Sequence, residues 1–206
     1  MKKTTVAIIV FGLVLCFTVG GALAWLIDTT PSVTNTFTYG DINIDLSETT
    51  PPLYKMVPGK ALSKDPRVTV KANSEKCWLF VKVEASDNLS QFVAYQINTG
   101  ENDWTALEGV SGVYYRTVEA STADQTFSVL AGGTYTSSDP SETLSWSENQ
   151  VLVKPEVEKE ELNALTEGAY PTLTFTAYAV QYEGFEDNPA AAWAQITSAN
   201  TTTTTP

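Results

Sequence analysis

The stretch CWLFVKVEA, residues 77–85, decides the fold because its side chains alternate between two faces. Its odd positions are all small or apolar, whereas its even positions run from Trp78 and Phe80 to Lys82 and Glu84. A period of two residues is typical of a β-strand. Because both faces are apolar at its start, we expect this strand to lie in the middle of a sheet.

Further alternating runs flank this strand and are separated by Gly, Asn, Asp and Pro. They lie at residues 67–72, 113–118, 126–130, 150–153 and 173–182. Threonine, valine, tyrosine and tryptophan are plentiful, and these residues favour strands. The sequence therefore predicts an all-β (mainly β) fold with a few short helices, arranged as a jelly-roll-like β-sandwich.

Helical signals are few and local. Apolar residues at helical spacing after Asn88 predict a helix over 89–97, and residues 156–167 form a charged candidate. Asn188 and Pro189 have the residue types favoured at the N-cap and the first helical position, so a third helix is expected through Ile196.

The amino terminus has the three parts of a secretory signal. Lys2 and Lys3 precede an apolar run over 6–19, and Ala22 and Ala24 occupy the −3 and −1 positions of a cleavage site. The mature chain is expected to begin at Trp25. Contact with a membrane is then expected only through the uncleaved signal.

We expect four segments along the chain. They are a signal peptide at 1–24, an N-terminal donor-type strand segment at 25–50, a β-sandwich domain at 51–198 and a disordered Thr-rich tail at 199–206. Removal of the signal takes two lysines, so the formal charge falls from −12 to −14. Such a charge makes nucleic acid a poor partner. Cys77 is the only cysteine after the signal, so no intrachain disulfide is expected in the mature chain.

The segment behind the cleavage site has the pattern of a long strand. Apolar residues occupy odd positions before Gly40 and even positions after it, as an inserted bulge residue would produce. The proposed assembly strand consists of Val33, Phe37, Tyr39, Ile42, Ile44 and Leu46. A strand at a free chain end can pair with its own domain or with the open sheet edge of a neighbour, and the pattern leaves both open.

No catalytic, metal or cofactor site emerges from the sequence. The chain has no histidine, which removes the His-Glu-x-x-His zinc motif and the Ser-His-Asp and Cys-His pairs. No Ser-x-x-Lys occurs either. Core packing is the favoured interpretation of the tryptophans, and solvated loops that of the loop acids, but two less favoured binding sites remain open. They are a glycan platform of Trp78, Trp104, Trp146 and Trp193, and a calcium site at Asp139, Glu142 and Asp187. We predict a protein that is not an enzyme and has no cofactor.

Several motifs resemble the TasA/camelysin family of secreted proteins of Gram-positive bacteria. The resemblance is carried at the amino terminus by residues 20–25, 27–29, 33–40 and 42–46, and later by 56–59, 64–66, 77–83, 177–181 and Trp193. It implies a jelly-roll subunit that a dedicated signal peptidase releases and that forms biofilm-matrix fibres by completing a neighbour's sheet. Camelysin-like relatives carry a metallopeptidase label, which the absence of histidine argues against.

The expected function is therefore structural. The protein is predicted to be secreted to the extracellular matrix or cell surface and to polymerise head-to-tail, because a strand given to the next copy leaves an open-ended contact. Expected partners are neighbouring subunits, signal peptidase during export, and other matrix proteins. The alternative is a monomeric secreted β-sandwich that acts as an adhesin or fibre-accessory protein.

Overall fold

The computed structural model describes residues 41–49, 55–100, 102–138 and 142–202. The signal peptide, its cleavage site and Val33, Phe37 and Tyr39 lie outside the described residues. The chain divides into two units, 1–39 and 40–206, and everything described belongs to the second.

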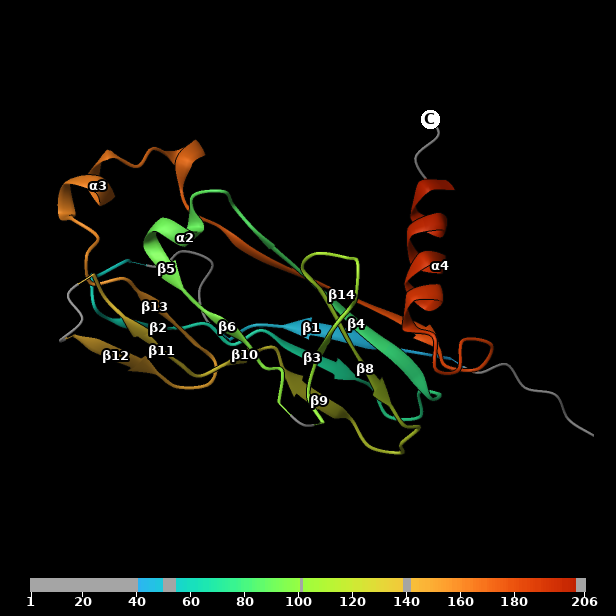
Figure 1. The fold of residues 1–206 in the computed structure, drawn as a ribbon. Helices are drawn as coiled ribbons and strands as arrows, with labels where there is room; N and C mark the ends of the chain where they lie inside the picture. The colour runs from blue at the N-terminus through green and yellow to red at the C-terminus, as the bar shows by residue number, and fades with distance from the viewer. Residues whose placement is uncertain (1–40, 50–54, 101, 139–141, 203–206) are drawn as a thin grey trace, which may run out of the picture. The chain divides into compact units, whose positions relative to one another are not determined.

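The described part is an antiparallel β protein with a few helices, which confirms the predicted fold class (Figure 1). Its largest sheet has the order β14 (Leu173–Gln181), β4 (Cys77–Ala85), β8 (Val113–Val118) and β7 (Thr105–Ala106). A second sheet consists of β1 (Ile44–Ser47), β3 (Arg67–Val70) and β9 (Gln125–Ser128). A third consists of β2 (Ala61–Ser63), β13 (Gln150–Val153) and β5 (Val93–Ala94). Two strand pairs complete the set: β10 (Leu130–Ala131) with β6 (Gln96–Ile97), and β11 (Gly133–Thr136) with β12 (Thr143–Trp146).

The strand β4 is central and carries a hydrophobic core on each face, as its sequence predicted. Its odd residues Cys77, Leu79 and Val81 are fully buried and pack with residues of β3, β10 and β13. Its even residues Trp78 and Phe80 form a second cluster with the helix α4 (Pro189–Thr202). The first cluster lies between the four-stranded sheet and the layer formed by the shorter sheets, and α4 covers the outer face of the larger sheet.

The helices follow their local signals only in part. The helix α4 begins as predicted, because the Asn188 side chain accepts a hydrogen bond from the Ala191 amide at 3.0 Å. Its backbone continues to Thr202, into the segment predicted to be a disordered tail. The charged segment forms α3 (Lys159–Ala164), which has a capping box between Glu158 and Glu161, followed by a 3-10 turn, η1 (Glu167–Ala169).

The predicted helix over 89–97 is wrong after its first turn. Only α2 (Leu89–Phe92) is helical, and the chain then enters β5 and β6. These two strands pair with β13 and β10, which lie far away in the sequence. Long-range pairing overrides the helical spacing of this stretch.

Candidate functional site: a free sheet edge and its groove

The strand β14 is a nine-residue edge strand of the largest sheet. The Ser86 amide donates to the Thr172 carbonyl and the Tyr182 amide donates to the Lys76 carbonyl, so even residues of β14 face β4 with their backbone groups. The odd residues therefore direct their N–H and C=O groups away from β4, to the outer edge. Four of these odd residues also pack their side chains against the first core cluster: Leu173, Phe175, Ala177 and Ala179. Among the described residues no strand is hydrogen-bonded to this outer row, although β1 packs close to β14, and the inner face of the edge is apolar.

A groove runs along the first half of this edge. One cavity of about 270 Å³ is lined by Met56, Lys64, Leu89, Val93, Val151 and Pro171–Thr174. A second cavity of about 360 Å³ is lined by Leu46–Glu48, Lys64, Pro66 and Leu173–Phe175. The two share Lys64, Leu173 and Thr174 and therefore lie side by side; together we call them the β14 groove. Leu89, Val93 and Val151 are buried, so the groove reaches the core.

A pair of charges forms one wall of the β14 groove. Lys64 Nζ lies 3.0 and 3.2 Å from the two carboxylate oxygens of Glu48, and its side chain is 13% exposed. The same Nζ lies 5.4 Å from the centre of the Phe175 ring. Lys64 is the only cation that lines either cavity among the described residues. Apolar side chains dominate the first cavity, whereas the Lys64–Glu48 ion pair lines the second.

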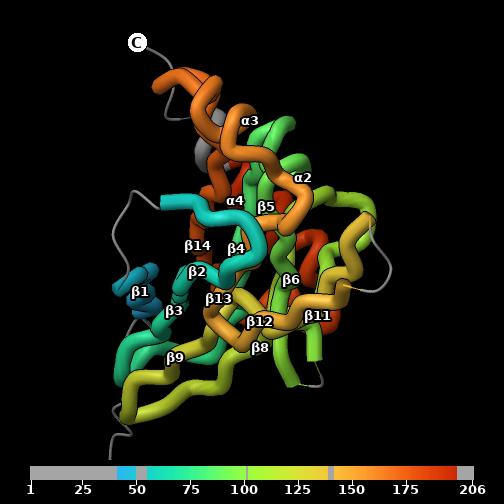
Figure 2. The backbone as a smooth tube through the Cα atoms, turned by 90° about the vertical axis from the view of Figure 1, so that its left-hand side faces the viewer, coloured from blue at the N-terminus to red at the C-terminus, as the bar shows by residue number. Residues whose placement is uncertain are grey.

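The later half of the predicted assembly strand lies in its own subunit. The strand β1 pairs antiparallel with β3, and Ile42, Ile44 and Leu46 pack against the first core cluster (Figure 2). Pairing within the chain is one of the two arrangements that the sequence left open for these residues. The strand β3 provides backbone hydrogen bonds for β1, and the first core cluster provides apolar contacts for these side chains.

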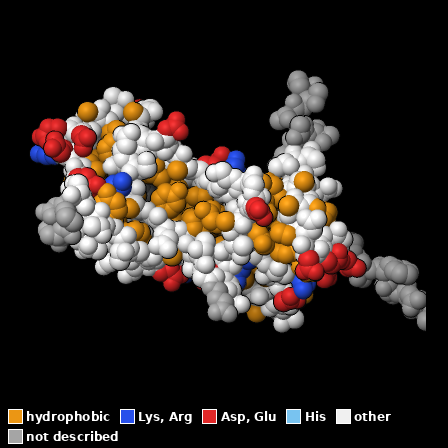
Figure 3. Space-filling model, in the orientation of Figure 1, with side chains coloured by type: hydrophobic (Ala, Val, Ile, Leu, Met, Phe, Trp, Pro, Cys, Tyr) orange, Lys and Arg blue, Asp and Glu red, His pale blue; other side chains and the backbone are white. Residues whose placement is uncertain are grey.

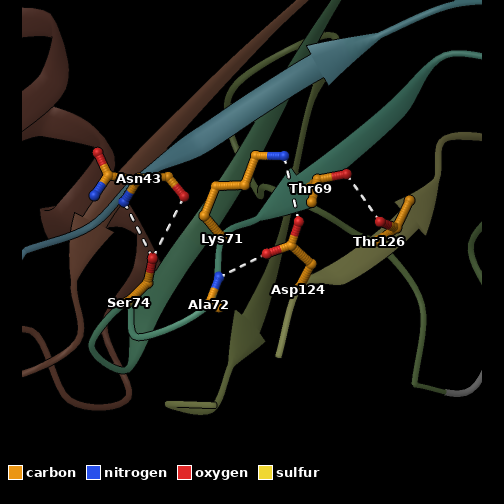
Figure 4. A network of polar contacts seen from close by, with 7 residues as sticks. All are labelled: Asn43, Thr69, Lys71, Ala72, Ser74, Asp124 and Thr126. Atoms are coloured by element: carbon orange, nitrogen blue, oxygen red, sulfur yellow. Dashed lines mark hydrogen bonds and ion pairs between the residues drawn. The ribbon is translucent and has the colours of Figure 1, made fainter. Parts of the chain in front are cut away.

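Polar contacts fix both ends of β1. At its start, the Asn43 amide donates to Ser74 Oγ at 3.1 Å (Figure 4). The Lys71 amide donates to the Asn43 carbonyl at 2.8 Å. At its end, the Thr49 amide donates to the buried Asp65 carboxylate at 3.0 Å. The predicted donor-type segment at 25–50 stays a prediction; of it, the structure describes residues 41–49, which include β1.

The four tryptophans considered as a glycan platform are core residues. Trp78, Trp104, Trp146 and Trp193 are all less than 10% exposed. A cavity of about 380 Å³ does lie beside Trp78, but Arg116 on its wall is engaged within the chain. Its guanidinium donates to the Asn102 carbonyl at 2.7 Å and lies 3.7 Å from the centre of the Phe127 ring. The Arg116 guanidinium is thus held by contacts within the chain, although its Nε has no hydrogen-bond partner among the described residues.

Other candidate chemistry can be placed in the structure. Cys77 is fully buried, and burial raises the pKa of its thiol to about 11, as befits a core residue. The part of the chain that the structure describes has no group of three His, Cys, Asp or Glu residues placed to hold a metal ion. Glu142 and Asp187 fall in this part, whereas Asp139 lies outside it. Among the same residues, no helix is long and apolar enough to cross a membrane.

Comparison with known proteins returned no matching family model and no matching curated protein. The function must therefore be argued from the free edge of β14 and the groove beside it. Sequence patterns identified β14 as a strand but gave no signal for its place at the edge.

Proposed function

We propose that this protein is a secreted structural subunit that assembles head-to-tail into extracellular, biofilm-matrix fibres by giving its N-terminal strand to the next subunit. The observation that carries the proposal is the outer edge of β14, to which no strand of the described residues is hydrogen-bonded and beside which lies a partly apolar groove. A long free edge with an apolar face binds an extended segment through backbone hydrogen bonds and side-chain pockets.

The donated segment is residues 25–40, which precede the first strand held within the subunit. It contains Val33, Phe37 and Tyr39 from the predicted assembly strand, at alternating positions suited to one face. Extended at about 3.3 Å per residue, this segment spans roughly 50 Å, whereas β14 needs about 30 Å. The donor is therefore long enough to cover the whole edge.

The expected energetics favour assembly. Backbone hydrogen bonds contribute about 1 kcal/mol each, and a large apolar side chain contributes about 2 kcal/mol when it is buried. A handful of each offsets the entropy that two subunits lose on association. Because donor and acceptor are different surfaces, the contact repeats without closing and yields filaments.

The sequence motifs support membership of the TasA/camelysin family as part of the same proposal. Signal peptidase would free the donor by cutting between Ala24 and Trp25, immediately before it. Other matrix proteins are proposed as further partners. The assembly chemistry requires no catalytic residue, metal or cofactor.

A monomeric adhesin or fibre-accessory protein is the second candidate. The observation in its favour is the pairing of β1 within its own chain, since the described unit already has a closed core without a neighbour. The two functions differ in whether the purified, processed protein polymerises.

Substitution on one face of the donor separates these functions. We expect the secreted V33S/F37S/Y39S variant to fold and remain monomeric, because its apolar face is lost. The matched T34S/T36S/T38S variant changes the other face and should form fibres like the wild type. Electron microscopy and sedimentation measure both. Polymerisation of V33S/F37S/Y39S at the wild-type rate, or a wild-type protein that stays monomeric at high concentration, would refute strand donation.

A further inference from the structure

We propose that the donated strand of a second copy runs antiparallel to β14, with its Phe37 opposite Leu173 and its Val33 opposite Ala177. This inference rests on the proposed function and adds the direction and register of the donor. Charge at one end of the molecule, apolar surface at the other and the reach of the chain each support it.

The end of the molecule where β14 finishes is acidic. The Tyr182 amide donates to the Lys76 carbonyl, and the Glu75 amide donates to the carbonyl of Asp41, the first described residue, so the described chain also begins at this end. Lys71 and Lys76 are each paired with an acid here, and further acids give this end a net negative charge. The acidic residues at this end are Asp41, Glu75, Glu119, Asp124, Glu183, Glu186 and Asp187.

This acidic end favours one direction of the donor. The donated segment joins its own subunit at Asp41, and therefore at the acidic end. A donor parallel to β14 would end near Gln181 of its neighbour and bring the acidic ends of two copies together. An antiparallel donor instead brings the acidic end of one copy to the Leu173 end of the next. Because like charges repel, the antiparallel direction is favoured.

The Leu173 end has a different surface. The exposed large hydrophobic residues of the described chain are Val57, which is 42% exposed, and Tyr170, which is 50% exposed. Each is next in sequence to a residue that lines the first cavity, Met56 or Pro171. Exposed apolar surface beside an apolar cavity is typical of a binding site. The charged residues nearest to these two in sequence have both signs: Lys55, Lys60 and Glu167.

The donor side chains match the β14 groove in this register. Residues opposite each other on neighbouring strands share a face, and the odd residues of β14 face the first core cluster. With Phe37 opposite Leu173, the aromatic ring lies over the largely apolar first cavity. Asn35, the polar residue at an odd position of the run, falls opposite Phe175, where the Lys64–Glu48 pair lines the second cavity.

The reach of the chain makes this arrangement intermolecular. Phe37 precedes Asp41 by four residues, which span at most about 14 Å. Asp41 lies at the Gln181 end of β14, and the eight residues from there back to Leu173 span about 26 Å. The Phe37 of a subunit therefore cannot lie opposite its own Leu173. A parallel strand, by contrast, can fold back from Asp41 within one subunit, so the direction of the strand reports its origin.

Cysteine cross-linking tests the direction. The T38C/T172C variant, secreted from the full chain and processed, is oxidised with copper phenanthroline and run on a non-reducing gel. We expect a ladder of covalent multimers, because the proposed register makes Thr38 and Thr172 a non-hydrogen-bonded pair, whose Cα separation suits a disulfide. Thr172 is exposed, and Cys77 does not interfere because it is fully buried. The matched control T34C/T172C moves the donor cysteine by four residues, about 13 Å, and should give no ladder.

Each outcome bears on one of the two proposals. Fibres that give no T38C/T172C ladder, or that give a T34C/T172C ladder instead, would overturn the direction and register and leave strand donation intact. A T34C/T172C cross-link within one chain, seen as a monomer of increased mobility, would show the segment folded back in its own subunit and overturn both proposals. A wild-type protein that forms no fibres would overturn strand donation itself.

Discussion

At the residue scale, one buried carboxylate, that of Asp65, binds the chain where β1 ends, next to the β14 groove. Asp65 is 6% exposed and accepts hydrogen bonds from both the amide and the hydroxyl of Thr49. The neighbouring residue, Lys64, forms an ion pair with Glu48, which precedes Thr49 in the chain. The Lys64-Asp65-Pro66 motif, which contributes to the family resemblance, thus ties the end of β1 to the turn between β2 and β3. This contact holds the end of β1 in its own subunit, next to the β14 groove.

Removing the Asp65 carboxylate should therefore loosen the end of β1. We expect Asp65→Ala to lower the free energy of unfolding by about 1–3 kcal/mol, because the amide and hydroxyl of Thr49 lose the carboxylate that accepts their hydrogen bonds. Asp124→Ala is the matched control, because Asp124 caps the Ala72 amide at an exposed position and should matter less. Urea unfolding followed by circular dichroism measures both. Equal urea midpoints for Asp65→Ala and the wild type would show that the Thr49–Asp65 contact does not contribute to stability.

The thiol of Cys77 provides a second test at this scale. Burial raises its pKa to about 11, so at pH 8 only about one thiol in a thousand is ionised, and the group is also shielded from reagents. We expect no labelling by a thiol reagent in the folded, processed protein and complete labelling in denaturant. Rapid labelling of the folded protein would indicate that the core around β4 opens readily.

At the element scale, the two sides of β14 have different roles. The backbone groups of even residues bind β4, whereas those of odd residues face the free edge. Thr176 and Ala177 are neighbours in sequence and represent these two sides. Proline is tolerated in an edge strand only where its missing N–H would have pointed outward.

Proline substitution at these two positions separates folding from assembly. Ala177→Pro should fold and fail to polymerise, because it removes one donor from the outer row and blocks close approach. Thr176→Pro removes a bond to β4 and should be less stable than Ala177→Pro by at least about 2 kcal/mol. Thermal unfolding and electron microscopy report the two effects. If Ala177→Pro forms normal fibres, β14 is not the acceptor edge.

The elements also show how far sequence reasoning extends. The bounds of β4, β8 and β13 agree with the alternating runs, because most of their apolar side chains are buried. The hairpin of β11 and β12 was missed, since its threonine-rich strands lack a clear apolar face. Alternation identifies a strand but carries no information on its neighbours. The edge position of β14, and therefore the candidate site, required the three-dimensional arrangement.

At the scale of the whole molecule, negative charge opposes the association of subunits. The chain has a formal charge of −12, which the proposed removal of the signal would make −14, and acidic side chains lie toward both ends of the face in Figure 3, while hydrophobic ones gather across its middle. Like charges repel over a Debye length, which is about 10 Å at 0.1 M salt. Assembly by strand donation has to overcome this repulsion.

Salt should therefore accelerate fibre growth. We expect the elongation rate of the processed protein to rise when sodium chloride increases from about 10 to 150 mM, because repulsion is screened while the groove contacts are buried. Light scattering follows the rate, and sucrose serves as a control that adds no ions. A rate that falls steadily with salt would mean that exposed ion pairs drive association.

The most direct measurement of the central claim is a high-resolution electron cryomicroscopy reconstruction of the material formed by the processed protein. The account predicts filaments in which residues 25–40 of one subunit lie along β14 of the next, hydrogen-bonded to Leu173, Phe175 and Ala177. Density that traces this segment back into its own subunit, with the edge of β14 uncovered or occupied by something else, would contradict it.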